Sequence, residues 1–186
     1  MNQDIGRAIV FSMPVVSAAV SLILISLDTT RSSNTVDRKI HYNMIAVYCL
    51  MILFWSGLVM HSIARDTFIA YLPVFFSSFA FIPVFLYRIT HIITDTGERK
   101  LFPACHFILP ACLTLIICAI ALAVPLRQRW AAIYDNEVNL TSAIIDITFI
   151  VCILLCILYS WLSLLRIKSY KRKIIDYSAD IYRMSL

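Results

Sequence analysis

The sequence predicts an all-α fold, a polytopic helical membrane bundle of about five transmembrane helices with a short cytoplasmic amphipathic C-terminal helix. Two observations predict it. Hydrophobic residues make up 61% of the chain and charged residues 15%, whereas soluble domains carry about half and about a quarter. The lysines and arginines also lie mostly between long apolar runs. We expect residues 1–165 to form the five-span domain and residues 166–186 to form a basic tail.

Five apolar runs cover residues 8–27, 42–63, 67–89, 101–124 and 142–165. Each has about 20 residues or more, which is enough to cross about 30 Å of hydrocarbon at 1.5 Å per residue. Backbone groups in lipid must pair with one another, so each run should be a helix. The first run follows Asp4 and Arg7 rather than a clearly positive segment and is longer than a signal-peptide core. It is therefore expected to be an uncleaved span.

The basic residues predict the orientation of these spans. With the N-terminus outside, twelve of the 16 lysines and arginines fall in cytoplasmic segments and four in outer segments. Positive residues prefer the cytoplasmic side. The expected location is a bacterial inner membrane, with the N-terminus outside and the C-terminus in the cytoplasm.

No pattern in the sequence predicts catalysis. A His-Glu-x-x-His motif, a phosphate loop and a Gly-x-Ser-x-Gly turn are all missing from the sequence, so we expect neither enzymatic activity nor a cofactor. The cysteines lie inside apolar runs, where they behave as small hydrophobic residues rather than as disulfide partners or metal ligands. They are Cys49, Cys105, Cys112, Cys118, Cys152 and Cys156.

Two ionisable residues inside spans, Asp146 and His106, are candidates for ligand binding or proton relay, because such residues are costly in lipid. In the predicted topology they lie near opposite faces, roughly 15 Å apart in depth, which makes them separate features. Asp146 is interpreted either as a buried aspartate satisfied by Thr148 or water, or as part of an outward-facing ligand pocket. His106 is interpreted either as a structural residue that bonds a carbonyl freed by Pro110 or as a relay residue.

The third run is rich in phenylalanine and contains Pro73 and Pro83. Prolines inside a helix remove hydrogen bonds and bend it, so a kinked helix is predicted. Its aromatic side chains are expected to contact lipid or pack inside the bundle. The alternative is that they line an apolar ligand pocket.

The tail combines basic residues with an apolar pattern. Residues 167, 170, 174, 177, 181 and 184 are apolar or aromatic at spacings of three and four, as in a heptad seam. The tail is interpreted either as an amphipathic helix on the anionic inner leaflet or as a linker helix that carries movement, self-associates or contacts a cytoplasmic effector. Its juxtamembrane position explains the charge without nucleic acid. The basic residues are Arg166, Lys168, Lys171, Arg172 and Lys173.

Two segments carry a family resemblance. They are Arg88–Leu109, with Arg-Ile-Thr-His followed by Glu-Arg-Lys-Leu-Phe-Pro-Ala-Cys-His, and Tyr170–Leu186, with Asp-Tyr-Ser and a closing Arg-Met-Ser-Leu. The chain resembles the N-terminal membrane domain of bacterial transcriptional regulators that carry an AraC-type helix-turn-helix domain. The resemblance implies a further effector domain after the tail. DNA binding is carried over to no residue here.

These observations favour a sensory or signalling membrane domain that relays a cue to a cytoplasmic effector. A small transporter or transporter subunit is the alternative, although five spans do not divide into two equal repeats. A membrane enzyme is a third class, and it would require His106 and Asp146 to converge.

Overall fold

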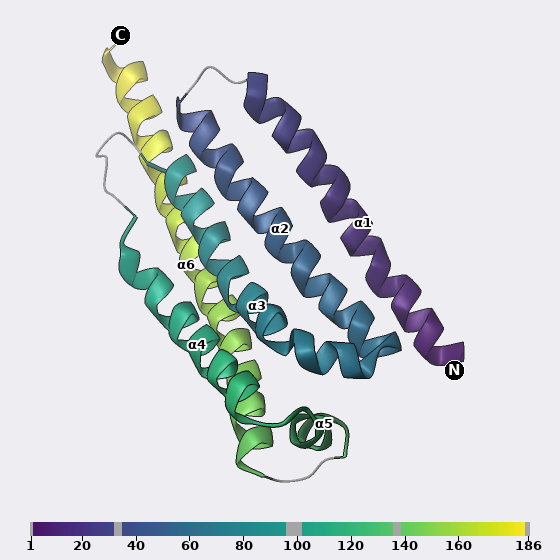
Figure 1. Ribbon diagram of the computed structural model, residues 1–186. Coiled ribbons are helices and arrows are strands. Elements are labelled where there is room, and N and C mark those ends of the chain that lie inside the picture. Colours follow the sequence, from purple (N-terminus) through teal and green to yellow (C-terminus); the bar gives the residue numbers. More distant parts are fainter. Residues whose placement is uncertain (1, 32–34, 96–101, 136–138, 185–186) are drawn as a thin grey trace.

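The computed structural model describes residues 2–31, 35–95, 102–135 and 139–184, and for residues 2, 3, 31 and 176–184 it describes the backbone alone. The described residues form six α-helices and one short 3-10 helix (Figure 1). They are α1 (Asn2–Arg31), α2 (Thr35–Ile63), α3 (Arg65–Ile93), η1 (Ala104–Phe107), α4 (Ile108–Ala123), α5 (Leu126–Tyr134) and α6 (Leu140–Met184).

Five of these helices are long and apolar enough to cross a membrane, which confirms the predicted fold class. The chain is a multi-pass membrane protein. The candidate spans are Asp4–Thr30, Thr35–Ile63, Arg65–Ile93, Ala104–Ala123 and Leu140–Ile175. Four of them extend beyond the predicted apolar runs, because helices continue through the polar headgroup region, where water and lipid headgroups solvate the charged ends. The fourth, Ala104–Ala123, lies within its run of residues 101–124.

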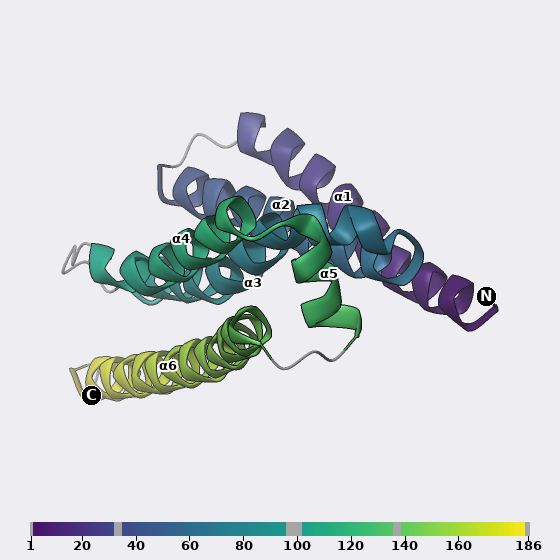
Figure 2. The ribbon, with the colours of Figure 1, turned by 60° about the horizontal axis from the view of Figure 1, so that its bottom comes forward.

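Helix α3 is the centre of the bundle. It packs against α2 on one side and against α4 and α6 on the other, and it also touches α5 and η1. Helix α1 packs chiefly against α2 and lies at the edge in both views (Figures 1 and 2). Most of the apolar surface of α1 therefore faces away from the bundle.

The aromatic side chains of α3 pack inside the bundle, which is one of the outcomes that the sequence left open. Phe68, Phe75 and Phe76 are buried and join one apolar cluster with residues of α4 and α6. Phe75 also lies directly against Gly57 of α2, where a Cβ atom would come within 2.6 Å of the Phe75 ring. Gly57 therefore allows α2 and α3 to approach closely.

Helix α3 continues through both of its prolines and is bent, as predicted (Figure 1). A proline has no N–H, so the carbonyl four residues before it loses its helical partner. For Pro73 this is the carbonyl of Ile69. This carbonyl accepts a hydrogen bond from a different helix, as described below.

The tail is helical, as predicted, and it belongs to the same helix as the fifth span. It continues the fifth span without a break, so that α6 is a single helix of 45 residues. At 1.5 Å per residue its length is about 68 Å, more than twice the hydrocarbon thickness. The short helix α5 was not predicted, because its nine residues are fewer than the window over which a helical period can be recognised.

Candidate functional site

The strongest cluster of polar side chains lies where α6 leaves the bundle, beside the C-terminus of α3; we call this end of the molecule the Thr94 end. Arg166 of α6 donates a hydrogen bond from Nε to Oγ1 of Thr94, with 2.7 Å between the two atoms. Thr94 caps the C-terminus of α3, and its own N–H bonds to the carbonyl of Thr90. The basic start of the tail is therefore fastened to the last turn of the central helix.

About two helical turns before Arg166, Tyr159 of α6 reaches η1. The Tyr159 hydroxyl donates to the backbone carbonyl of His106 over 3.2 Å, and the Nδ1 atom of His106 lies 3.2 Å from the same hydroxyl oxygen. Pro110 has no N–H to offer to the carbonyl of His106, which leaves that carbonyl free to accept. When Nδ1 carries the hydrogen, one phenol group both donates to and accepts from His106.

Aromatic rings surround this pair. Tyr87 of α3 lies 5.4 Å from the His106 ring and 5.6 Å from the Tyr159 ring, measured between centroids. Phe102 lies 5.0 Å from His106 and 5.5 Å from His91, which is buried. These rings partly shield the His106–Tyr159 hydrogen bonds from solvent, and a lower local dielectric strengthens such bonds. We call Tyr87, His91, Phe102, His106 and Tyr159 the Tyr159 cluster.

The Thr94 end is rich in positive charge. Besides Arg166, Arg88 lies over the Phe102 ring at 5.9 Å and over the Phe107 ring at 5.8 Å. Cation–π contacts of this kind hold a guanidinium at an apolar surface without a carboxylate. Lys168, Lys171, Arg172 and Lys173 of the tail are exposed beyond it. This end of the molecule is thus suited to contact anions.

The structure does not bring the two sequence candidates together. His106 contacts Tyr159, which lies 13 residues along α6 from Asp146, or about 20 Å. The His106 side chain was expected to donate to the carbonyl that Pro110 frees. This expectation was wrong, because another residue is the donor. The carbonyl that Pro110 frees is the one of His106 itself, and Tyr159 is the donor.

Asp146 is exposed on the face of α6 that points away from the core, so its interpretation as a buried aspartate was wrong. The predicted partner, Thr148, is buried and donates instead to the carbonyl of Ile144 over 2.7 Å. Asp146 lies 20 residues, or about 30 Å, before Arg166 along α6. That distance is comparable to the hydrocarbon thickness, so the two residues lie about one membrane thickness apart along α6.

Sequence reasoning missed a buried arginine at the other end of the bundle, which we call the α5 end. Arg129 is only 7% exposed. Its Nη1 donates to the carbonyl of Ile69, which Pro73 leaves free, and its Nε donates to the carbonyl of Val124 at the end of α4, each over 3.1 Å. The sequence shows both residues, Arg129 in a predicted loop and Pro73 in a predicted span, but no sequence pattern indicates that they belong together.

Tyr134 of α5 completes the α5 end. Arg65 of α3 lies over its ring, with 5.1 Å from the guanidinium carbon to the ring centroid. Burial raises the pKa of the Tyr134 hydroxyl above its ordinary value, and the positive charge of Arg65 opposes this effect. Tyr134 therefore stays neutral at physiological pH and serves as an aromatic support for the cation.

These side chains make hydrogen bonds, cation–π contacts and ring contacts between helices, an arrangement that can couple one helix to another. Within the ranges that the structure describes, no three His, Cys, Asp or Glu side chains gather as metal ligands do. Comparisons of the chain with models of protein families, with curated proteins and with solved structures found no match.

Proposed function

We propose that this chain is a sensory or signalling domain of a bacterial inner membrane, which relays a cue along α6 to a cytoplasmic effector. The observation that carries the proposal is the continuity of α6 from the α5 end, through the bundle, into the basic tail (Figure 1). A helix is stiff over this length, so a shift or rotation of its membrane part moves the tail as well. A tail joined through a loop would lose that movement.

The contacts at the Thr94 end suit a two-state element. Two points fasten α6 to the rest of the bundle there, the Arg166–Thr94 bond and the bonds between Tyr159 and His106. Each is a small number of hydrogen bonds that can break together and re-form. A cue that favours the released state by a few kcal/mol would shift the population of α6 positions.

The proposed orientation puts the Thr94 end at the cytoplasmic face and the α5 end outside. It rests on the distribution of lysines and arginines, of which the cytoplasmic segments hold twelve and the outer segments four. Arg166 and the exposed lysines after it then lie at the anionic inner leaflet.

The proposed partner of the tail is a cytoplasmic effector domain or a second tail. Ile167 and Ile174, one heptad apart, are each 49% exposed and so are available for contact. The tail also continues the axis of the span rather than turning along the membrane (Figure 1), which favours the linker interpretation. Seam residues 177, 181 and 184 belong to the part of α6 for which the structure describes the backbone alone. The resemblance to AraC-type regulators suggests a transcriptional effector.

Insertions into the tail test the relay. We would fuse a dimer-dependent transcriptional reporter after Leu186 and insert one to seven alanines after Ile175 in the full chain. Each added residue turns the distal helix by about 100°, and seven restore the starting direction to within about 20°. We expect basal output to change about fivefold or more with two or five added residues, as a coupling of 1–3 kcal/mol allows, and to recover with seven.

Protein levels in the membrane fraction, measured by immunoblot, are the control for expression. An output that stays the same for every insertion length contradicts the relay, because a rigid helix cannot be rotated without changing what it presents.

A further inference from the structure

A polar pocket lies between the end of α1 and the start of α2, on the same side of the membrane as the Thr94 end. Its volume is about 470 Å³, within the range of small-molecule sites. Three side chains of α1 line it, and three of α2 spaced by four and three residues, so that each set shares one helix face. They are Ser26, Thr29, Thr30, Arg38, Tyr42 and Ile45.

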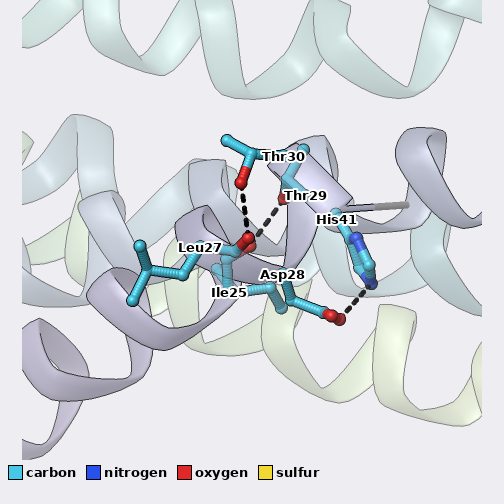
Figure 3. A network of polar contacts seen from close by, with 6 residues as sticks. All are labelled: Ile25, Leu27, Asp28, Thr29, Thr30 and His41. Carbon is cyan, nitrogen blue, oxygen red and sulfur yellow. Dashed lines mark hydrogen bonds and ion pairs between the residues drawn. The ribbon is translucent and has the colours of Figure 1, made fainter. Parts of the chain in front are cut away.

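The three hydroxyls of α1 offer the pocket acceptors rather than donors. Each donates its hydrogen to a backbone carbonyl three or four residues earlier in α1, over 2.6 to 2.7 Å. Figure 3 shows the bonds of Thr29 and Thr30. A hydroxyl has one hydrogen and two lone pairs, so the side left over can only accept. A ligand that meets these oxygens must bring N–H or O–H groups.

The two polar side chains of α2 offer the opposite character. Arg38 Nη2 lies 3.4 Å from the Tyr42 hydroxyl, which accepts from it and keeps its own hydrogen for a ligand. The remaining N–H groups of a guanidinium suit a phosphate or carboxylate. The pocket thus has an anion-binding wall on α2 and an acceptor wall on α1.

The depth of the pocket limits the ligand further. Just beside it, His41 Nε2 and Asp28 Oδ2 lie 3.4 Å apart (Figure 3). A charged carboxylate at the end of an apolar run is expected in the headgroup region rather than in the hydrocarbon, so the pocket is expected at that level. Ile45 lies two turns further along α2 than Arg38, towards the hydrocarbon. The pocket therefore runs along α2 from the apolar Ile45 to the cationic Arg38. A phospholipid runs in the same order, from its acyl chains to its phosphate.

We propose that this pocket binds the headgroup of an inner-leaflet phospholipid that joins a phosphate diester to a primary ammonium, the phosphoethanolamine class. The phosphate contacts Arg38 and Tyr42, and the ammonium donates to the hydroxyl oxygens of α1. This site is independent of the relay along α6.

Lipid binding to the purified full chain, measured by native mass spectrometry from micelles with added lipid, tests the proposal. Phosphatidylcholine is the matched ligand, because its headgroup keeps both charges but has no N–H. We expect phosphatidylethanolamine to bind about tenfold more tightly, since one charge-assisted hydrogen bond accounts for such a factor. Excess soluble glycerophosphoethanolamine distinguishes a membrane lipid from a free headgroup compound as the ligand. Weak competition identifies the membrane lipid as the ligand, whereas full competition overturns a lipid-specific site.

Variants test whether the preference for ethanolamine over choline depends on the α1 and α2 walls of the pocket. Thr29→Val keeps the shape and removes an acceptor, so it should reduce the preference for ethanolamine over choline at least threefold. Arg38→Gln should weaken both lipids about tenfold, whereas Lys39→Gln, a neighbouring cation that does not line the pocket, should leave both unchanged. Circular dichroism checks that each variant folds. Equal binding of the two lipids, or equal losses in Arg38→Gln and Lys39→Gln, overturns the proposal.

Discussion

Replacing Arg129 with glutamine is expected to lower the free energy of unfolding by about 3 kcal/mol, because two buried carbonyls lose a charged donor. The Ile69 carbonyl cannot find a helical partner, since Pro73 stands where that partner would be. The Val124 carbonyl ends α4 and faces the same guanidinium. Unfolding in mild detergent, followed by circular dichroism or by a thiol-reactive probe, measures the change.

Arg127→Gln is the matched control for this prediction. Arg127 belongs to the same short helix and is exposed, so its replacement should stay within about 0.5 kcal/mol of the parent. Pro73→Ala supplies a second test, because alanine restores the N–H that Ile69 lacks. In that background Arg129→Gln should cost at least 1 kcal/mol less. Equal costs in both backgrounds would show that Arg129 does not act through the carbonyl of Ile69.

Gly57→Ala is expected to lower the free energy of unfolding by 1–3 kcal/mol, about the cost of overpacking a tight contact. The added methyl carbon would lie 2.6 Å from Cδ2 and 3.4 Å from Cβ of Phe75, so the ring cannot simply swing away. Phe75 is held in turn by Phe54, whose ring stacks on it at 5.1 Å. The substitution should therefore separate α2 from α3.

Gly6→Ala is the control, since nothing lies within 4 Å of its added carbon. Alanine is also the better helix former, so this variant should be neutral or slightly more stable. Phe75→Leu, which removes the ring edge, should absorb part of the cost of Gly57→Ala. A fully additive double variant, or a Gly57→Ala variant as stable as the parent, contradicts the close approach of the two helices.

Much of the fold follows from the sequence because the membrane acts on local properties. Lipid demands about 20 apolar residues per span and internal pairing of the backbone, and the five apolar runs show both requirements without knowledge of the tertiary structure. The bend of α3 was also local, since Pro73 and Pro83 impose it. The packing of Phe68, Phe75 and Phe76 within the bundle is one of the outcomes that the sequence left open, because the number of aromatic residues on a helix does not decide between lipid and bundle contacts.

The contacts that define the candidate site could not be predicted in this way. Tyr159 and His106 lie 53 residues apart, and Arg129 and Ile69 lie 60 apart. A tyrosine in an apolar run looks like any other core residue until the fold places a freed carbonyl beside it. The prediction of a buried Asp146 failed for a related reason, because an ionisable residue in a span was expected to face the interior of the bundle. Asp146 is exposed on α6 instead.

The insertion of α6 through the membrane is the premise of the whole account, and labelling of one residue on each side of the predicted span tests it most directly. Single cysteines would replace Arg127 and Lys168, both exposed, in a full chain whose own cysteines are changed to alanine or serine. A membrane-impermeant maleimide is then applied to spheroplasts before and after permeabilisation. The account predicts that the cysteine at position 127 reacts in intact spheroplasts and that the one at position 168 reacts only after permeabilisation. Labelling of both positions in intact spheroplasts, or the reverse pattern, would contradict it.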